Sequence, residues 1–475
     1  MKHILYLLLS LLFFACSPRQ KQPAGFTASA AVQIDAATGS CPYLTEDNFH
    51  QPVLSWVRNT SDSTVIFCYA ISSDLGKSFG TPVMISASTN VYPHAENLPK
   101  LLFKADGSIL AVWGAANPNP QNKYAGLIYY SQSFDGGKTW SGASPLVKNP
   151  VANDQRYFDL KALPNGQAAI VWLDARKSSS HKGSALYFAT TEGKNGFGEG
   201  HLIQEPCCEC CRTNLSVDRS GNIHVVYRAI IQDSIRDMVY VVSHNGGKTF
   251  SAPLRISADD WVINSCPHSG PSMTLTNSNV QVAWFTGGRQ SGILYARLPE
   301  KQPEFISKDT VSHRGRHPQI TTLGNGNILI SWEEPVISNG EVYSRIGLEQ
   351  RNQDGKVLYR NFVTPENARA SYPVLQSLKD GSVLLAYTVS EGKNTHVAFQ
   401  KIDIPAISTA NTATAALERP LIEQPARLLA ISNAKDPACG MALPKEAADT
   451  ILWEGKVIGF CSPDCKTVFK KKHFK

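Results

Sequence analysis

A hairpin-rich unit of about 50 residues recurs along most of this chain. Each unit has a short strand, a turn of the Asp-Gly or Asn-Gly type and a strongly apolar strand that ends near an aromatic residue, as in 101–113 and 160–172. Such turns favour tight hairpins because glycine adopts positive φ at little cost. Seven aromatic residues close successive units at intervals of 48 to 59 residues: Trp56, Trp113, Trp172, Tyr227, Trp284, Trp332 and Tyr387. This pattern predicts an all-β fold, a β-propeller over residues 41–404, with seven units counted and six possible.

Three units share a motif of the form S-x-D-x-G-x-[ST]-[FW]. It occurs at 72–79 and 133–140, and at 243–250 with Asn in place of Asp. The motif resembles the Asp-box (BNR repeat) of sialidase-like propellers. The resemblance implies that the carboxylate and hydroxyl bond the backbone of their own turn while the aromatic residue packs between strands. The motif therefore indicates a fold and says little about a reaction.

The resemblance to sialidases extends only partly to their catalytic residues. That family implies three arginines that bind a carboxylate sugar, a Tyr–Glu nucleophile pair and an Asp acid/base. The F/Y-R-I-P segment that carries the first arginine is missing, and the region reads Gly39-Ser-Cys-Pro-Tyr-Leu-Thr-Glu46. Weak catalytic candidates follow inner strands or begin the last unit: Arg176, Arg228, Arg289 and Tyr372. Arg176 is also placed to make a local turn contact with Asp174.

Residues 435–475 carry motifs of another kind. Asp436-Pro-Ala-Cys-Gly-Met441 is followed by Trp453-Glu-Gly-Lys456 and by Phe460-Cys-Ser-Pro-Asp-Cys-Lys466. This order resembles the YHS domain of the TRASH-like heavy-metal-binding group. The resemblance implies a small α+β domain that binds a soft metal through Cys439, Cys461 and Cys465. Thiolates suit Cu(I) or Zn(II), so copper or zinc is expected; the alternative is that these cysteines pair or stay as buried thiols.

The N-terminus resembles a bacterial lipoprotein signal. Lys2 and His3 precede an apolar run, 4–14, which is too short to span a membrane stably. The run ends in Ala15-Cys16-Ser17, which resembles a lipobox although Phe13 replaces the usual leucine, and implies lipidation of Cys16. We therefore expect a signal peptide at 1–16, a flexible tether at 17–40 and a lipid-anchored location in the bacterial cell envelope, outside the cytoplasm. Ordinary secretion is the alternative.

Charge and cysteine content limit the partners. The net charge of +7 is spread along the chain without a basic stripe interleaved with aromatics, so no nucleic-acid partner is expected. Apart from Cys16, ten of the 11 cysteines remain. An even number outside the cytoplasm makes disulfides the alternative to metal ligation at every one of them.

Cysteines and histidines gather where the repeat units open. The opening segments are 41–43, 93–96, 206–212, 266–271 and 316–318. Because inner strands of a propeller begin near its axis, these segments are predicted to converge at the channel. The candidate metal ligands there, with His317 alongside, are Cys41, His94, Cys207, Cys208, Cys210, Cys211, Cys266 and His268.

The Cys207-Cys-Glu-Cys-Cys211 run has a geometric limit. Adjacent Cα atoms are about 3.8 Å apart, below the roughly 4.4–6.8 Å of most disulfides, so neighbours should rarely bridge. In an extended strand Cys207 and Cys211 face one way and Cys208 and Cys210 the other, so the thiols can face one point only if the segment turns. Disulfide staples, a metal or redox site, and unpaired core thiols all remain open for this run.

The two thiol-rich regions together, joined by a Thr/Ala/Pro-rich linker at 405–434, favour an exported lipoprotein that binds a soft heavy metal and assists metal handling. Envelope metal-transport proteins or glycans are the candidate partners, with the membrane reached through the lipid anchor. The alternative function is a sialidase-like exo-glycosidase acting on sialylated or related glycans. A third possibility is a propeller that serves only as a protein-binding platform.

Overall fold

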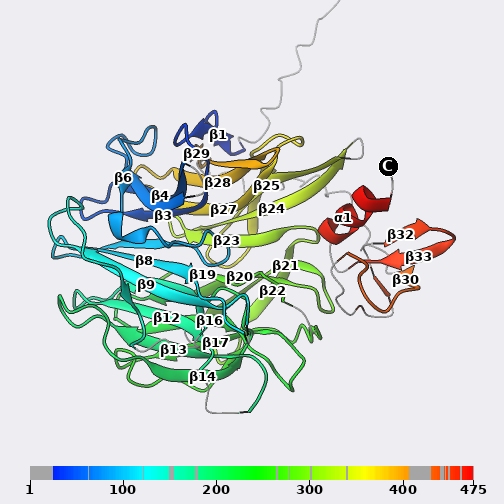
Figure 1. The fold of residues 1–475 in the computed structure, drawn as a ribbon, viewed down its shortest axis with the longest axis horizontal. Helices are drawn as coiled ribbons and strands as arrows, with labels where there is room; N and C mark the ends of the chain where they lie inside the picture. The colour runs from blue at the N-terminus through cyan, green and yellow to red at the C-terminus, as the bar shows by residue number, and fades with distance from the viewer. Residues whose placement is uncertain are drawn as a thin grey trace, which may run out of the picture.

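Seven antiparallel sheets, each built around four strands, form a seven-bladed β-propeller over the described part of the chain (Figure 1). The structure is a computed structural model. It describes residues 25–475 except 62–63, 121, 149–153, 177–179, 264–265, 278, 300–301, 339–340, 406–428, 439–442, 444–445, 448–449, 461–462 and 474–475. The predicted all-β propeller is confirmed, with seven blades rather than six.

The strands fall into four concentric positions. The inner strands are β3 (Gly39–Glu46), β7 (Lys100–Phe103), β11 (Gln155–Ala162), β15 (Asn214–Val217), β19 (Ser272–Leu275), β23 (Arg316–Thr322) and β27 (Ala370–Ser377). The second strands are β4 (Pro52–Ser61), β8 (Ile109–Ala116), β12 (Ala168–Asp174), β16 (Ile223–Arg228), β20 (Asn279–Thr286), β24 (Ile328–Ser338) and β28 (Val383–Glu391). The third strands are β5 (Thr64–Ile71), β9 (Gly126–Ser133), β13 (Ser184–Thr190), β17 (Met238–Ser243), β21 (Gly292–Pro299), β25 (Glu341–Arg351) and β29 (Asn394–Asp403). The outer strands of the first six blades are β6 (Val83–Met84), β10 (Ser144–Pro145), β14 (His201–Cys207), β18 (Leu254–Arg255), β22 (Ile306–Ser312) and β26 (Val357–Phe362).

The seventh blade is completed by the start of the chain. Strand β1 (Thr27–Ala28) pairs with β29, and β2 (Val32–Gln33) pairs with the same strand further along. Residues 27–33 therefore belong to the propeller, although the sequence placed them in a tether that ended at residue 40. These short strands have neither the turn nor the closing aromatic of a repeat unit, so the repeat pattern could not reveal them.

The second strands carry the core between blades. Their seven closing aromatics are all buried, and Trp56, Trp113, Trp172, Trp284 and Trp332 are among the largest fully buried side chains. Each inner strand contacts the inner strand of the next blade, including β27 with β3, so the ring is continuous. A 3-10 turn, η1 (Ser86–Ser88), leads from the first blade toward the second.

The Asp-box residues make the contacts that the motif predicts. In the first box the Ser72 hydroxyl accepts the Gly76 N–H at 2.8 Å, and the Asp74 carboxylate accepts the Ser78 N–H at 2.9 Å. The box at 133–140 repeats both bonds, and the box at 243–250 does so with Asn245. Phe79 packs edge-on against Phe399 of the seventh blade, which shows that the motif also joins neighbouring blades.

Four inner strands contain a bulge at the same place. The pairing with the second strand shifts at Cys41, Tyr157, His317 and Tyr372, and each of these residues has φ between 50° and 60°. Left-handed backbone at non-glycine residues is strained and often accompanies functional sites. The bulges belong to blades one, three, six and seven.

The C-terminal unit is a small α+β arrangement, as expected. Its described elements are β30 (Leu429–Ala430), β31 (Glu446–Ala447), β32 (Thr450–Trp453), β33 (Lys456–Gly459) and α1 (Pro463–His473). Phe469 of the helix packs against Trp453 and Phe460, with ring centroids 5.1 and 5.3 Å away. No helix among the described residues is long and apolar enough to cross a membrane. The predicted signal peptide with Cys16 and most of the predicted linker lie outside the described residues.

Candidate metal centre

The segment after β14 turns and gathers three thiols. Cys207 ends the strand, and the chain then turns through 208–211 before β15 begins. The Cys208 N–H donates to the Arg228 carbonyl at 2.8 Å, which fixes the start of the turn. The sulfurs of Cys208 and Cys210 are 3.6 Å apart, and those of Cys208 and Cys211 are 3.7 Å apart. The turn is what allows the 207–211 run to present several thiols to one point, because an extended strand would direct them to opposite sides.

The fifth blade adds two more ligands. Cys210, Cys266 and His268 have ligand atoms that all lie within 4.8 Å of one another, and so do Cys208, Cys210 and Cys211. Ligands bound to one ion at about 2.3 Å lie about 3.8–4.0 Å apart in tetrahedral or trigonal geometry. The separations of the Cys208 sulfur from the sulfurs of Cys210 and Cys211, 3.6 and 3.7 Å, are close to these values. We call these five residues the thiol cluster.

The surroundings favour the thiolate at two members of the thiol cluster, Cys211 and Cys266, whereas contacts with neighbouring thiols and burial raise the pKa of Cys208 and of Cys210. Burial opposes ionisation of Cys211, but hydrogen bonds from Cys208 and Cys210 and the charge of Arg228 hold its pKa well below the usual value. A hydrogen bond from Cys210, together with His268, lowers the pKa of Cys266 to about 5 although burial acts in the opposite direction. The same contact with Cys266 raises the pKa of His268. Thiolates are the form that binds metals.

A buried ion pair lies beside the thiol cluster and joins four blades. Arg212 pairs with Glu96, whose side chain is 1% exposed. The guanidinium also donates to the Pro318 carbonyl at 2.8 Å and to the Pro271 carbonyl at 3.3 Å, while Glu96 accepts the Gly270 N–H at 2.9 Å. These groups come from the second, fourth, fifth and sixth blades, so the pair fixes the segments that lead into the inner strands.

Rings from five blades form two groups of contacts, and the charge of Glu96 acts on Tyr157, His268 and Tyr372 among them. His94 packs against Tyr157 and His268, with centroids 5.7 and 6.0 Å away, and His317 stacks on Tyr372 at 4.1 Å. Burial, then the charges of Glu96 and Glu333, raises the pKa of Tyr372, while Arg212 lowers it. Burial, aided by His268 and Arg156, lowers the pKa of His94 to about 4, so its imidazole is neutral near pH 7.

The structure leaves three propeller cysteines out of the thiol cluster. Cys207 contacts the Gln204 carbonyl at 3.6 Å, and Cys68 contacts the Trp56 carbonyl at 3.5 Å within the first blade. Cys41 lies beside Ser40 and the His94 backbone, and burial raises the pKa of its thiol to about 11. His94 contacts His268 but belongs to neither ligand set. The seven cysteines of the described propeller are all thiols rather than disulfides.

Of the C-terminal candidates, the structure describes only Cys465, which is half-buried on α1. Cys439 and Cys461 lie outside the described residues. The three-thiol site of the YHS resemblance therefore stays a prediction.

The candidate catalytic arginines are engaged by protein groups. Arg176 bonds Asp174 through two nitrogens at 3.0 and 2.7 Å, the local contact expected from the sequence. Arg228 is buried over the Trp261 ring and donates to the Ser269 and Phe285 carbonyls. Arg289 is 76% exposed and pairs with Asp260 at 2.5 Å. At Tyr372 the bond is made by the backbone rather than the side chain: its N–H donates to Glu333, which also lies 2.9 Å from His317.

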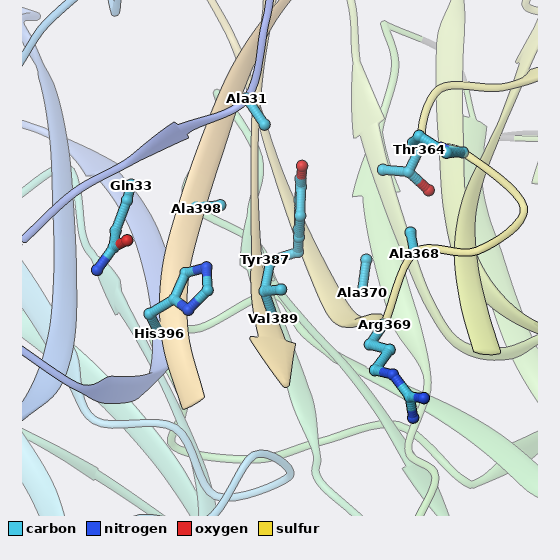
Figure 2. Close-up of a pocket in the computed structure, with 11 residues that line it drawn as sticks. Ala31, Gln33, Thr364, Ala368, Arg369, Ala370, Tyr387, Val389, His396 and Ala398 are labelled. Carbon is cyan, nitrogen blue, oxygen red and sulfur yellow. The ribbon is translucent and has the colours of Figure 1, made fainter. Parts of the chain in front are cut away.

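A pocket of about 360 Å³ lies away from the thiol cluster, on the seventh blade (Figure 2). Its wall includes Tyr387 and Val389 of β28, His396 of β29, Gln33 of β2 and Arg369. It contains none of the candidate residues predicted from the sequence.

Sequence reasoning missed the buried pair of Glu96 and Arg212 and the contacts of Glu333 with His317 and Tyr372. Glu96 and Arg212 lie inside opening segments in which only the cysteines and histidines were predicted to be site residues. Three of the four bulges have a common feature in the sequence, because Cys41, His317 and Tyr372 each precede a proline.

No protein-family model matches this chain, and no curated protein matches it. Among solved structures it is similar to a protein of unknown function from Dyadobacter fermentans, with 16% identity and a TM-score of 0.48 over 80% of this chain and 99% of that one. It is also similar to an intramolecular trans-sialidase from Ruminococcus gnavus, with 10% identity and a TM-score of 0.46 over 78% and 96%. The polysaccharide lyase Uly1 shares 12% identity and a TM-score of 0.49 over 78% and 91%. At these identities the likenesses concern the fold and assign no activity.

Proposed function

We propose that this protein binds a soft metal ion, Cu(I) or Zn(II), at the thiol cluster of its propeller and serves in metal handling in the bacterial cell envelope. The observation that carries the proposal is the convergence of four thiols and one imidazole from two blades at metal-ligand separations. Soft thiolate ligands with imidazole select copper or zinc over harder ions. Lipidation at Cys16 and a second site at Cys439, Cys461 and Cys465 are part of this proposal and rest on sequence motifs alone.

Metal content and accessible thiols measured on one purified sample test this function. The metal-loaded chain should contain stoichiometric copper or zinc, and the cluster thiols should resist alkylation until a chelator is added. Cys439→Ser, Cys461→Ser and Cys465→Ser should lower the stoichiometry without abolishing binding. A chain that binds neither ion, with all thiols reduced and reactive, would contradict the proposal. Loss of thiols without metal would show disulfides instead.

A second candidate function is the hydrolysis of sialylated or related glycans. The observation that favours it is Tyr372, held at a bulge beside Glu333 and under the influence of the Glu96 charge, since a tyrosine–carboxylate pair is the nucleophile of sialidase-like hydrolysis. Turnover of a fluorogenic sialoside that is lost in Tyr372→Phe, while the metal-binding variants retain it, would establish this function in place of the first.

A further inference from the structure

The two ligand sets of the thiol cluster share one residue. Cys208, Cys210 and Cys211 form the inner set, and Cys210, Cys266 and His268 form the outer set. Each set is compact by itself, but the five ligand atoms do not all lie within 4.8 Å of one another. Two atoms bound to one ion through bonds of about 2.3 Å can be at most about 4.6 Å apart. A single ion therefore cannot be bound by all five ligands in this arrangement, and it can be bound by only one of the two sets.

Three donors per set indicate the kind of ion. Structural zinc sites are almost always four-coordinate, whereas the inner set offers three sulfurs and the outer set offers two sulfurs and a nitrogen. Cu(I) is a soft d¹⁰ ion that is stable with three such donors. A thiolate has further lone pairs and can bind two Cu(I) ions at once.

We propose that the thiol cluster holds two Cu(I) ions bridged by the Cys210 thiolate, one in the inner set and one in the outer set. This inference rests on the proposed function and specifies its metal, stoichiometry and connectivity. No redox step is involved: the ions enter as Cu(I), and the thiols and imidazolium release their protons to solvent.

The surroundings suit a cluster with excess negative charge. Four thiolates and two Cu(I) ions sum to −2 (−4 plus +2). The Arg228 charge acts on Cys211, and the Arg236 charge acts on Cys208, so two guanidiniums face this charge. Glu209 pairs with Arg236 at 3.4 Å and offsets part of that contribution.

The two positions differ in access to solvent. Cys208, Cys210 and Cys211 are buried to within 1% exposure, whereas Cys266 and His268 are exposed. The outer ion is therefore the one that exchanges with a small soluble Cu(I) carrier, and the inner ion is held more firmly. Chelator competition should remove the outer ion first.

The test uses the full chain carrying Cys439→Ser, Cys461→Ser and Cys465→Ser, so that only the propeller contributes. Anaerobic Cu(I) titration against a chromogenic chelator should give two ions per chain, released in two phases, and X-ray absorption should show a short copper–copper distance. Cys266→Ser and His268→Asn should each reduce the stoichiometry to one and remove the copper–copper signal. Cys210→Ser should remove that signal and weaken both ions.

Cys41→Ser is the matched control, because this channel thiol belongs to neither set, and it should keep both ions. Thermal unfolding of each metal-free variant checks that it is folded. One ion per chain in the parent protein would overturn the two-ion inference and leave the proposed function standing, whereas no ion would overturn both. Two ions with the copper–copper signal intact in Cys210→Ser would overturn the bridge.

Discussion

Glu96 and Arg212 form a buried ion pair although 116 residues separate them in the chain. The pair links the segment before the second blade with the segment before the fourth, and its remaining hydrogen bonds reach the fifth and sixth. The thiol cluster lies on two of these segments, those before the fourth and fifth blades. The ion pair thus holds in place the backbone on which the metal ligands depend.

Glu96→Gln should destabilise the propeller strongly. The substitution leaves the Arg212 charge buried without its partner, a change that costs about 3–5 kcal/mol at buried pairs. Urea unfolding should show a clearly lower midpoint. Arg289→Gln removes an exposed pair instead and should change stability by at most about 1 kcal/mol. Equal effects from the two substitutions would contradict the assigned role of the buried pair.

Two adjacent glycines of the third Asp-box should respond differently to alanine. Both have positive φ, which costs an alanine about 1–2 kcal/mol. A Cβ on Gly246 would meet nothing within 4 Å, whereas one on Gly247 would lie 2.1 Å from the Phe188 ring of the neighbouring blade. Gly247→Ala should therefore lower stability by about 1–3 kcal/mol more than Gly246→Ala. Matching denaturation curves would show that the blades do not meet at this point.

The Asp-boxes should make stability depend on acid pH. Hydrogen bonds from the Thr139 hydroxyl and N–H lower the pKa of Asp135 to about 2. Burial opposes the shift at Asp74, but hydrogen bonds from Ser78 lower its pKa to about 2 as well. Because the folded-state pKa is depressed, the stabilisation is present above the ordinary pKa of 3.8 and is lost as pH falls toward 2.

Asn is native at the corresponding place of the third box, so Asp74→Asn and Asp135→Asn should preserve the turns. The double variant should lose less stability between pH 4 and pH 2 than the parent does, as measured by thermal unfolding across that range. An unchanged pH dependence would contradict the role of these two carboxylates.

Metal loading should stabilise the fold. A ligand that binds only the folded state contributes about 2.7 kcal/mol at a free concentration 100 times its dissociation constant. Adding Cu(I) should raise the unfolding temperature, a chelator should reverse the rise, and Cys210→Ser should abolish most of it. The same rise in Cys210→Ser would place the responsible site elsewhere.

The propeller could be predicted because its signals are local. Trp113 and Trp172 each close a unit that contains its own hairpin turn, so counting such units gives the number of blades. Strands β1 and β2 could not be predicted, since their partner lies at the other end of the propeller. The position of Glu96 opposite Arg212 is equally non-local.

The sequence predicts that the thiol-bearing segments converge, but it does not predict which of their cysteines form the thiol cluster. Repeat equivalence brings Cys266 near the 207–211 run, as expected. The membership of the cluster depends on the turn at 208–211, which directs Cys210 toward Cys266 and leaves Cys207 in the blade. The sequence pattern does not reveal that turn. Cys41, which was predicted as a ligand together with these cysteines, belongs to neither ligand set.

The pairing of β1 with β29 also sets an order of events during synthesis. Gln400 bonds the carbonyl of Ser29 across 371 residues. At about 5–20 residues per second, the N-terminal strand emerges roughly 20–75 seconds before its partner exists. Until then the ring is open at one blade, and the first-made segment must remain unpaired. A chain cut short before β29 would have six complete blades and a seventh without its third strand, so that β1 and β2 would have no partner.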